Sequence, residues 1–140
     1  MIKLIYDRTA LDVLQGNTKG QYKASDLNRV EQAVEVLSAL LPALDLYPVL
    51  TVKTDWCPPA LFSAQEWPVQ SQMDRYLENV RALVRLCGVE TALPASMTNL
   101  TWQGANQIEA ALHSVEERIK AVKNTYPYSG EIQSGEENGL

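Results

Sequence analysis

The sequence has few of the residues that build metal centres and disulfide frameworks. Among its 140 residues are two cysteines, Cys57 and Cys87, and a single histidine, His113. The cysteines are far apart, and neither belongs to a CxxC pair or to a cluster with the histidine. We therefore expect no metal ligands and no cofactor. Cys87 is interpreted as a core residue and Cys57 as a loop residue, with a disulfide or a reactive thiol as the alternatives.

Positive charge and long apolar runs are also scarce. Twelve Lys and Arg face seventeen Asp and Glu, which gives a formal charge of −5. This is the wrong sign for a protein that neutralises nucleic-acid phosphates, so we expect no nucleic-acid partner. No apolar run reaches the roughly eighteen residues of a membrane span, and the N-terminus meets charge too early for a signal peptide. We expect that the protein makes no membrane contact and that it stays in a reducing cytoplasm.

Recognisable catalytic motifs are missing as well. The sequence contains no GxSxG, no P-loop, no GxGxxG and no HExxH. At helical spacing, Glu109 and Glu116 share a face with His113, which favours a surface histidine paired with carboxylates over a general base. We therefore predict no catalytic residues and a protein that is not an enzyme.

The sequence does contain three long segments with apolar residues spaced for one face of a helix. The first runs from about Asp26 to Leu41, with Ser25 as cap and Pro42 as stop. The second follows Pro68 and ends at Cys87 before Gly88, and the third runs from about Trp102 to Lys123, with Thr101 as cap. The three predicted apolar stripes are Leu27, Val30, Val34, Leu37, Leu41 and Leu44; Val69, Met73, Tyr76, Val80, Leu83 and Cys87; and Ala105, Ile108, Leu112, Val115, Ile119 and Val122.

Two further segments complete the expected fold. A short helix is predicted near Asp7, ending at Gly16-Asn17. The stretch from Asp45 to Trp67 holds Trp56, Phe62 and Trp67, so it is predicted to be an ordered connection that covers the bundle. The fold class is all-α: a three-helix bundle with an extra short N-terminal helix and a long ordered connection.

The composition changes near residue 126. The last fifteen residues contain three acids and no bases, and they repeat Ser-Gly-Glu. Such a segment has too little apolar surface to order itself. We predict a helical bundle domain over residues 1–125 and a flexible acidic tail over residues 126–140.

Short polar groups interrupt the apolar pattern near Asp7, Asp26 and Lys53. Such groups usually satisfy free backbone donors at helix starts and turns, which is the structural interpretation. The alternative is partner binding, in which Arg8, Arg29 and Trp56 would be the anchors, because arginine and tryptophan are enriched among residues that dominate binding energy.

The blocks that carry these groups, taken together, resemble a known set of sequences. They are Asp7-Arg8-Thr9, Lys19-Gly20 leading through Tyr22 to Ser25-Asp26-Leu27-Asn28-Arg29-Val30-Glu31, Lys53-Thr54-Asp55-Trp56, Asn106 with Ile108-Glu109, and Tyr128-Ser129-Gly130-Glu131. In this order the chain resembles small uncharacterised proteins encoded in prophages of Gram-positive gut bacteria, often among tail and baseplate genes. The resemblance implies a virion-associated or accessory structural role, and it brings no catalytic residues.

The resulting hypothesis is a non-enzymatic structural or assembly protein of a phage tail or baseplate. It would act through protein contacts, with phage tail components or with further copies of itself as partners. It would reside in the cytoplasm of the host bacterium and could be incorporated into a virion. The alternative is a small intracellular regulatory or adaptor module, and an enzyme with an unfamiliar site is a third, weaker candidate.

Overall fold

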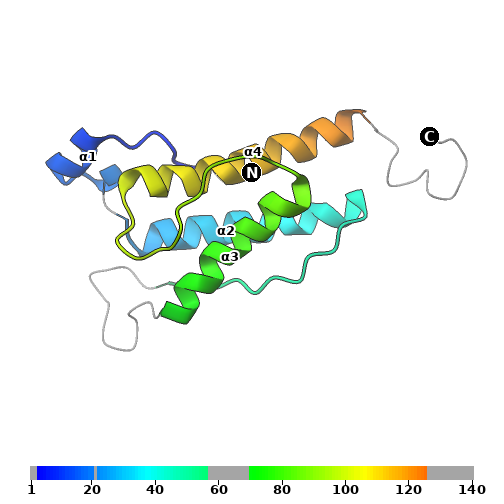
Figure 1. The fold of residues 1–140 in the computed structure, drawn as a ribbon, viewed down its shortest axis with the longest axis horizontal. Coiled ribbons are helices and arrows are strands. Elements are labelled where there is room, and N and C mark those ends of the chain that lie inside the picture. The colour runs from blue at the N-terminus through cyan, green and yellow to red at the C-terminus, as the bar shows by residue number, and fades with distance from the viewer. Residues whose placement is uncertain (1–2, 21, 57–69, 126–140) are drawn as a thin grey trace, which may run out of the picture.

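Three long helices pack around one apolar core, and a short helix precedes them (Figure 1). The computed structural model describes residues 3–20, 22–56 and 70–125, and no strand occurs within these ranges. The all-α prediction, including the extra N-terminal helix, is confirmed. The elements are α1 (Ala10–Gln15), η1 (Thr18–Gly20), α2 (Ala24–Leu40), η2 (Leu41–Leu44), α3 (Gln70–Cys87) and α4 (Trp102–Thr125), where η marks a 3-10 helix.

The core is made by most of the predicted stripe residues of α2, α3 and α4, whereas Val122 is only partly buried and is not part of it, and Val69 lies outside the described residues. Each helix turns one face inward, as the spacing of three and four residues requires. Leu44, Met73 and Cys87 are only partly buried against this core. The buried apolar side chains are Ala24, Leu27, Val30, Ala33, Val34, Leu37 and Leu41; Trp56; Tyr76, Leu77, Val80 and Leu83; and Ala105, Ile108, Ala111, Leu112, Val115 and Ile119.

The helix ends follow local signals, with one correction. Thr101 Oγ1 accepts the Gly104 N–H at 3.1 Å, which confirms the predicted cap of α4. Gly88 ends α3 in the left-handed conformation, with φ of 65°. The prediction of Ser25 as the cap of α2 is wrong, because the helix already begins at Ala24 and Lys23 is the cap residue. There Asp26 Oδ2 accepts the Lys23 N–H at 2.8 Å, so the acid of the first turn supplies the capping contact.

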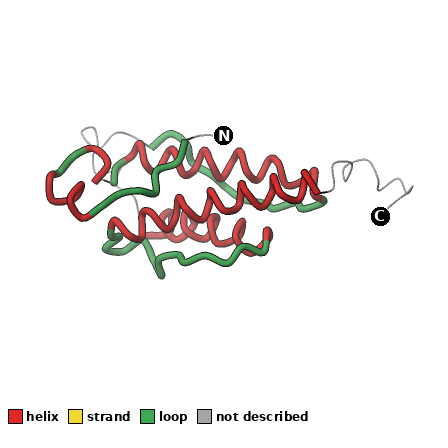
Figure 2. Tube along the Cα trace, turned by 90° about the horizontal axis from the view of Figure 1, so that it is seen from above, coloured by secondary structure: helices red, strands yellow, loops and turns green. Residues whose placement is uncertain are grey.

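The three long helices all run in the same direction, as the colour gradient in Figure 1 shows. Side-chain contacts agree, since Arg75 near the start of α3 pairs with Glu31 in the first half of α2. Parallel neighbours need connections that return along the whole bundle, whereas short loops join antiparallel helices. The loop over residues 88–101 makes such a return. It has to span the length of α3, which is about 27 Å at 1.5 Å per residue. Figure 2 shows the loops running along the outside of the helices.

The first half of the predicted connection is ordered and packed. Residues 45–56 run back along the bundle, and Leu50 and Val52 pack against the core. Trp56 is 4% exposed, which confirms the expectation of a buried tryptophan in this connection. Cys57, Phe62, Trp67 and the predicted acidic tail over residues 126–140 lie outside the described residues.

Candidate functional site

Two buried glutamates organise the polar interior of the bundle. The first is Glu109 of α4, whose side chain is 0% exposed. With Arg8, Asp26 and Arg29 it forms what we call the Arg8 cluster. Arg8 Nη2 lies 2.8 Å from Glu109 Oε2 and 3.4 Å from Asp26 Oδ1. The cluster therefore joins the N-terminal segment, α2 and α4 through charged hydrogen bonds.

Arg29 completes the cluster from α2. Its Nε donates to Glu109 Oε1 at 2.8 Å and its Nη2 donates to Glu109 Oε2 at 2.7 Å, a two-point contact. The same Nη2 lies 2.5 Å from Asp26 Oδ1. Burial alone would lower the pKa of Arg29, but the hydrogen bonds to Glu109 and Asp26 outweigh it and raise the pKa above its ordinary value. The guanidinium is therefore held firmly in its charged form.

The same helix face holds the backbone of the N-terminal segment. Glu109 Oε1 accepts the Ile5 N–H at 2.8 Å. Asn106 pairs with both backbone groups of Arg8: its Oδ1 accepts the N–H at 3.0 Å and its Nδ2 donates to the carbonyl at 3.0 Å. The Asn106 side chain thus pairs with the backbone N–H and C=O of this extended segment, as a neighbouring strand would in a sheet.

The charges of the Arg8 cluster nearly balance. Two guanidinium groups face two carboxylates, and Lys23 lies at the edge, 3.8 Å from Asp26. Arg8 Nε is the one buried side-chain nitrogen of the described residues without a hydrogen-bond partner. A balanced buried cluster stabilises a fold weakly relative to apolar packing, but loss of one member leaves an uncompensated charge inside.

A tyrosine pair borders the Arg8 cluster. The guanidinium of Arg8 lies over the Tyr22 ring, 5.5 Å from its centroid. The hydroxyl groups of Tyr22 and Tyr76 share a hydrogen bond. Burial raises the pKa of both tyrosines above the ordinary value, so both hydroxyls stay protonated and can bridge α3 to the start of α2.

The second buried glutamate is Glu31 of α2, which is 1% exposed. With Trp56 and Arg75 it forms the Glu31 cluster. Arg75 donates from Nη1 to Glu31 Oε1 at 2.9 Å and from Nη2 to Glu31 Oε2 at 2.8 Å. Trp56 Nε1 donates to the same Oε2 at 3.1 Å, so one carboxylate fixes α3 and the connection against α2.

The connection is held by the same device as the N-terminal segment. Asn28 pairs with both backbone groups of Trp56, accepting its N–H at 2.7 Å and donating to its carbonyl at 2.9 Å. Arg75 Nη1 and Asn79 Nδ2 both donate to the Thr51 carbonyl, each at 2.7 Å. In each extended segment, an asparagine pairs with the backbone of one residue, Arg8 or Trp56, and a buried glutamate accepts a hydrogen bond from the side chain of that same residue.

The structure brings Arg8 and Arg29 together, whereas Trp56 lies in the separate Glu31 cluster. All three contact their own chain: Arg8 and Arg29 donate to Glu109, and Trp56 donates to Glu31. Arg8 and Trp56 are 3% and 4% exposed, so in this conformation they present almost no side-chain surface to a partner.

Glu31 was not predicted to be buried and Glu109 was assigned to a surface face with His113, although the sequence contains a signal for the burial of both. Glu31 falls four residues after Leu27 and three before Val34, inside the apolar stripe of α2. Glu109 falls four residues after Ala105 and three before Leu112, in the same relation to the stripe of α4. A charged residue at a core position needs a buried partner, and this pattern predicts one.

Neither cluster is equipped for acid–base or nucleophilic chemistry. Their members are arginines, carboxylates and a tryptophan, and each carboxylate is engaged by guanidinium groups. A cavity of about 370 Å³ lies beside the Arg8 cluster, lined by Arg8, Val13, Tyr22 and the first turn of α4. The arrangement is suited to holding segments in place.

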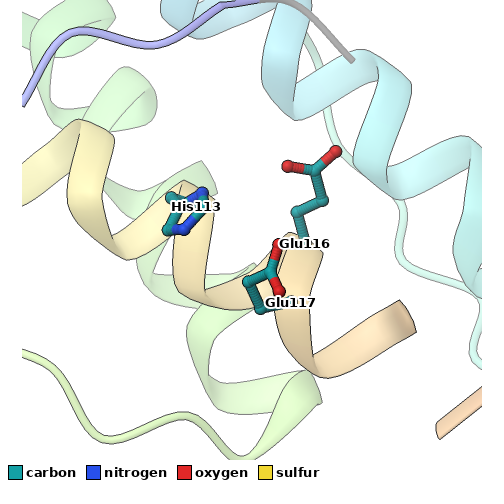
Figure 3. Close-up of side chains that lie close together, drawn as sticks. All are labelled: His113, Glu116 and Glu117. Atoms are coloured by element: carbon teal, nitrogen blue, oxygen red, sulfur yellow. The ribbon is translucent and has the colours of Figure 1, made fainter. Parts of the chain in front are cut away.

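The outer surface of α4 carries the histidine. His113, Glu116 and Glu117 lie on one stretch of this helix (Figure 3). The ring of His113 packs against that of Tyr6, with centroids 5.2 Å apart. The expected pairing of His113 with Glu109 is wrong, because Glu109 is buried and engaged by Arg8 and Arg29.

Comparison of the chain with protein-family models, with curated proteins and with solved structures found no match. Within the described ranges, no helix is both long enough and apolar enough to cross a membrane.

Proposed function

We propose that the chain is a non-enzymatic structural or assembly protein of a prophage, associated with the tail or baseplate, and that it acts through protein contacts made by α1. The observation that carries this proposal is the exposure of α1. None of its six residues is buried, and Leu11, Val13 and Leu14 are 57%, 47% and 83% exposed.

The short helix is held in shape by local contacts in place of core packing. Thr9 and Asp12 form a capping box, in which the Thr9 N–H donates to Asp12 Oδ2 at 2.9 Å and the Asp12 N–H donates to Thr9 Oγ1 at 3.2 Å. Gly16 closes the other end with φ of 66°. A helix of this length does not persist in water by itself, so these contacts are needed to hold it.

The following turn braces α1 from one side. Asn17 Nδ2 donates to Asp12 Oδ1 at 2.9 Å, and Asn17 Oδ1 accepts the Gly20 N–H at 2.9 Å. Gly20 approaches so closely that a Cβ there would lie 2.3 Å from the Asp12 carbonyl oxygen. The chain therefore keeps an ordered helix whose apolar side chains serve no purpose in its own core.

An ordered element with exposed apolar side chains is suited to recognition. Its order is already established before binding, so less conformational entropy is lost when a partner covers it. Figure 1 places α1 at the end of the bundle where α2 and α4 begin. The sequence resemblance to prophage proteins suggests a tail component or another copy of the chain as that partner.

The proposal is tested in cells that carry the prophage. Deleting the gene should abolish complete particles after induction, and the parent chain supplied in trans should restore them. Leu14→Ser removes the most exposed apolar side chain of α1, so we expect it to fold like the parent and to restore fewer than about a tenth of the particles. Val49→Ser, at a 97% exposed position outside α1, is the matched control and should restore them fully.

Two outcomes would contradict the proposal. One is a normal yield of complete particles in the deletion strain, since the chain would then not be needed for assembly. The other is full restoration by Leu14→Ser, verified as expressed and helical, because α1 would then not be the contact surface.

A further inference from the structure

We propose that His113, Glu116 and Glu117 form a surface site for a divalent transition-metal ion of the Zn²⁺ type. Each residue offers one ligand atom, and these atoms all lie within 4.8 Å of one another. The site lies on α4 apart from both buried clusters, and it does not depend on the proposed role of α1.

The spacing of the three residues produces this geometry. Residues three and four positions apart on an α-helix project from the same face, with Cβ atoms about 5–6 Å apart. Glu116 and Glu117 follow His113 by three and four positions, so both carboxylates can approach the imidazole. Small rotamer changes of these partly exposed side chains suffice to bring the atoms to the roughly 2.0–2.2 Å bonds of a zinc ion.

The chemistry of the donors selects the metal. An imidazole nitrogen with carboxylate oxygens suits Zn²⁺ and Cu²⁺, whereas Mg²⁺ prefers oxygen ligands alone. Two carboxylates also balance the two charges of the ion. Three protein ligands leave a fourth position for water, as in an open tetrahedral zinc site.

The surroundings leave room for an ion and its water. An open cavity of about 640 Å³ is lined by His113, Glu117 and Arg118 of α4 and by Gly88 and Glu90 of the loop after α3, and Glu116 is not among its lining residues. Glu90 adds a second carboxylate to this wall beside Glu117. Tyr6 packs on the His113 ring and restricts its rotation, which favours a defined ligand position.

One cation competes directly for the carboxylates. Lys120 Nζ lies 3.9 Å from Glu116 Oε2 and 3.7 Å from Glu117 Oε2. Its side chain is 59% exposed, so it can turn away into solvent when a metal binds. Removing its charge should therefore strengthen metal binding, an effect that a purely structural role of the three residues would not produce.

Isothermal titration calorimetry of the full chain with ZnCl₂ tests the site. We expect one saturable site that MgCl₂ does not fill at the same concentrations. His113→Ala should weaken the affinity at least tenfold, Glu117→Gln should weaken it severalfold, and Lys120→Gln should strengthen it severalfold. Glu35→Gln, an exposed glutamate on α2, is the matched control and should change nothing. Circular dichroism of each variant establishes that the fold is retained.

The proposal is overturned if ZnCl₂ produces no saturable binding. It is equally overturned if folded His113→Ala binds zinc as tightly as the parent, which is the result expected when the cysteine thiols hold the metal. A Glu117→Gln or Lys120→Gln variant indistinguishable from Glu35→Gln would also contradict it.

Discussion

The substitution Glu109→Gln tests the role of the buried carboxylates most sharply. It preserves the size of the side chain but removes the negative charge that Arg8 and Arg29 share. Asp26 would then be the single carboxylate facing two guanidinium groups, and the new amide N–H₂ would meet other donors. Removing one partner of a buried ion pair costs about 3–5 kcal/mol, so we expect a loss of that size in the free energy of unfolding.

The assay is urea unfolding followed by circular dichroism at equilibrium. Glu35→Gln on the exposed side of α2 is the control, and it should change the free energy of unfolding by less than about 0.5 kcal/mol. Hydrogen exchange adds a local measure, because the Ile5 amide donates to Glu109 and should lose protection first. A cost below about 1 kcal/mol for Glu109→Gln would refute the reasoning, since the guanidinium groups would then not depend on this charge.

Three further predictions address the core, the thiol and α1. Leu112→Ala removes a fully buried side chain of α4 and should cost about 2–5 kcal/mol in urea unfolding, with a cost below about 0.5 kcal/mol counting against the register of this helix. Burial raises the pKa of the Cys87 thiol, so in a Cys57→Ser background it should react with Ellman's reagent at pH 8 more slowly than free cysteine; an equal rate would contradict this. Hydrogen bonds from Asn17 and from the Thr9 N–H hold the pKa of Asp12 below its ordinary 3.8. The Asp12 carboxylate should therefore keep α1 ordered above pH 3.8, and this order should be lost as the pH falls through the lowered pKa of Asp12. Backbone chemical shifts measured between pH 5 and 2 would show the loss.

Much of the helical architecture could be predicted from the spacing of the apolar residues and from the residues that cap or end the helices. Leu37 and Val80 fall where the stripes place them, and Gly88 and Thr101 end and begin helices as predicted. The start of α2 was missed because two capping arrangements compete there. Ser25 has a suitable hydroxyl, but Asp26 can reach back to the Lys23 N–H and begin the helix earlier.

The polar interior could be predicted only in part. Arg8 was singled out as a possible partner-binding anchor, but its partner Glu109 lies 101 positions away and no local spacing connects them. What the sequence does contain is a glutamate inside each of two apolar stripes, which shows that a buried cation is needed without naming which one. Local spacing also does not show that Asn28 and Asn106 pair with the backbone of distant extended segments.

The relative direction of the helices was also not predicted from the sequence. Matched stripes predict a bundle but do not distinguish parallel from antiparallel neighbours, because both arrangements bury the same faces. The distinguishing signal is the length of the connections. The loop over residues 88–101 is long enough to return along α3, and a connection of that length permits the parallel arrangement seen here.

We propose that α1 is the surface through which the chain contacts its partner. The most direct measurement is site-specific photocrosslinking in cells that are assembling particles, with benzoylphenylalanine placed at position 14 or at position 49. Both positions are highly exposed, at 83% and 97%, so they differ in location far more than in access. We predict a discrete crosslinked species to a particle protein or to a second copy of the chain from position 14 and none from position 49. The absence of a crosslink from position 14, or equal products from both positions, would contradict the account.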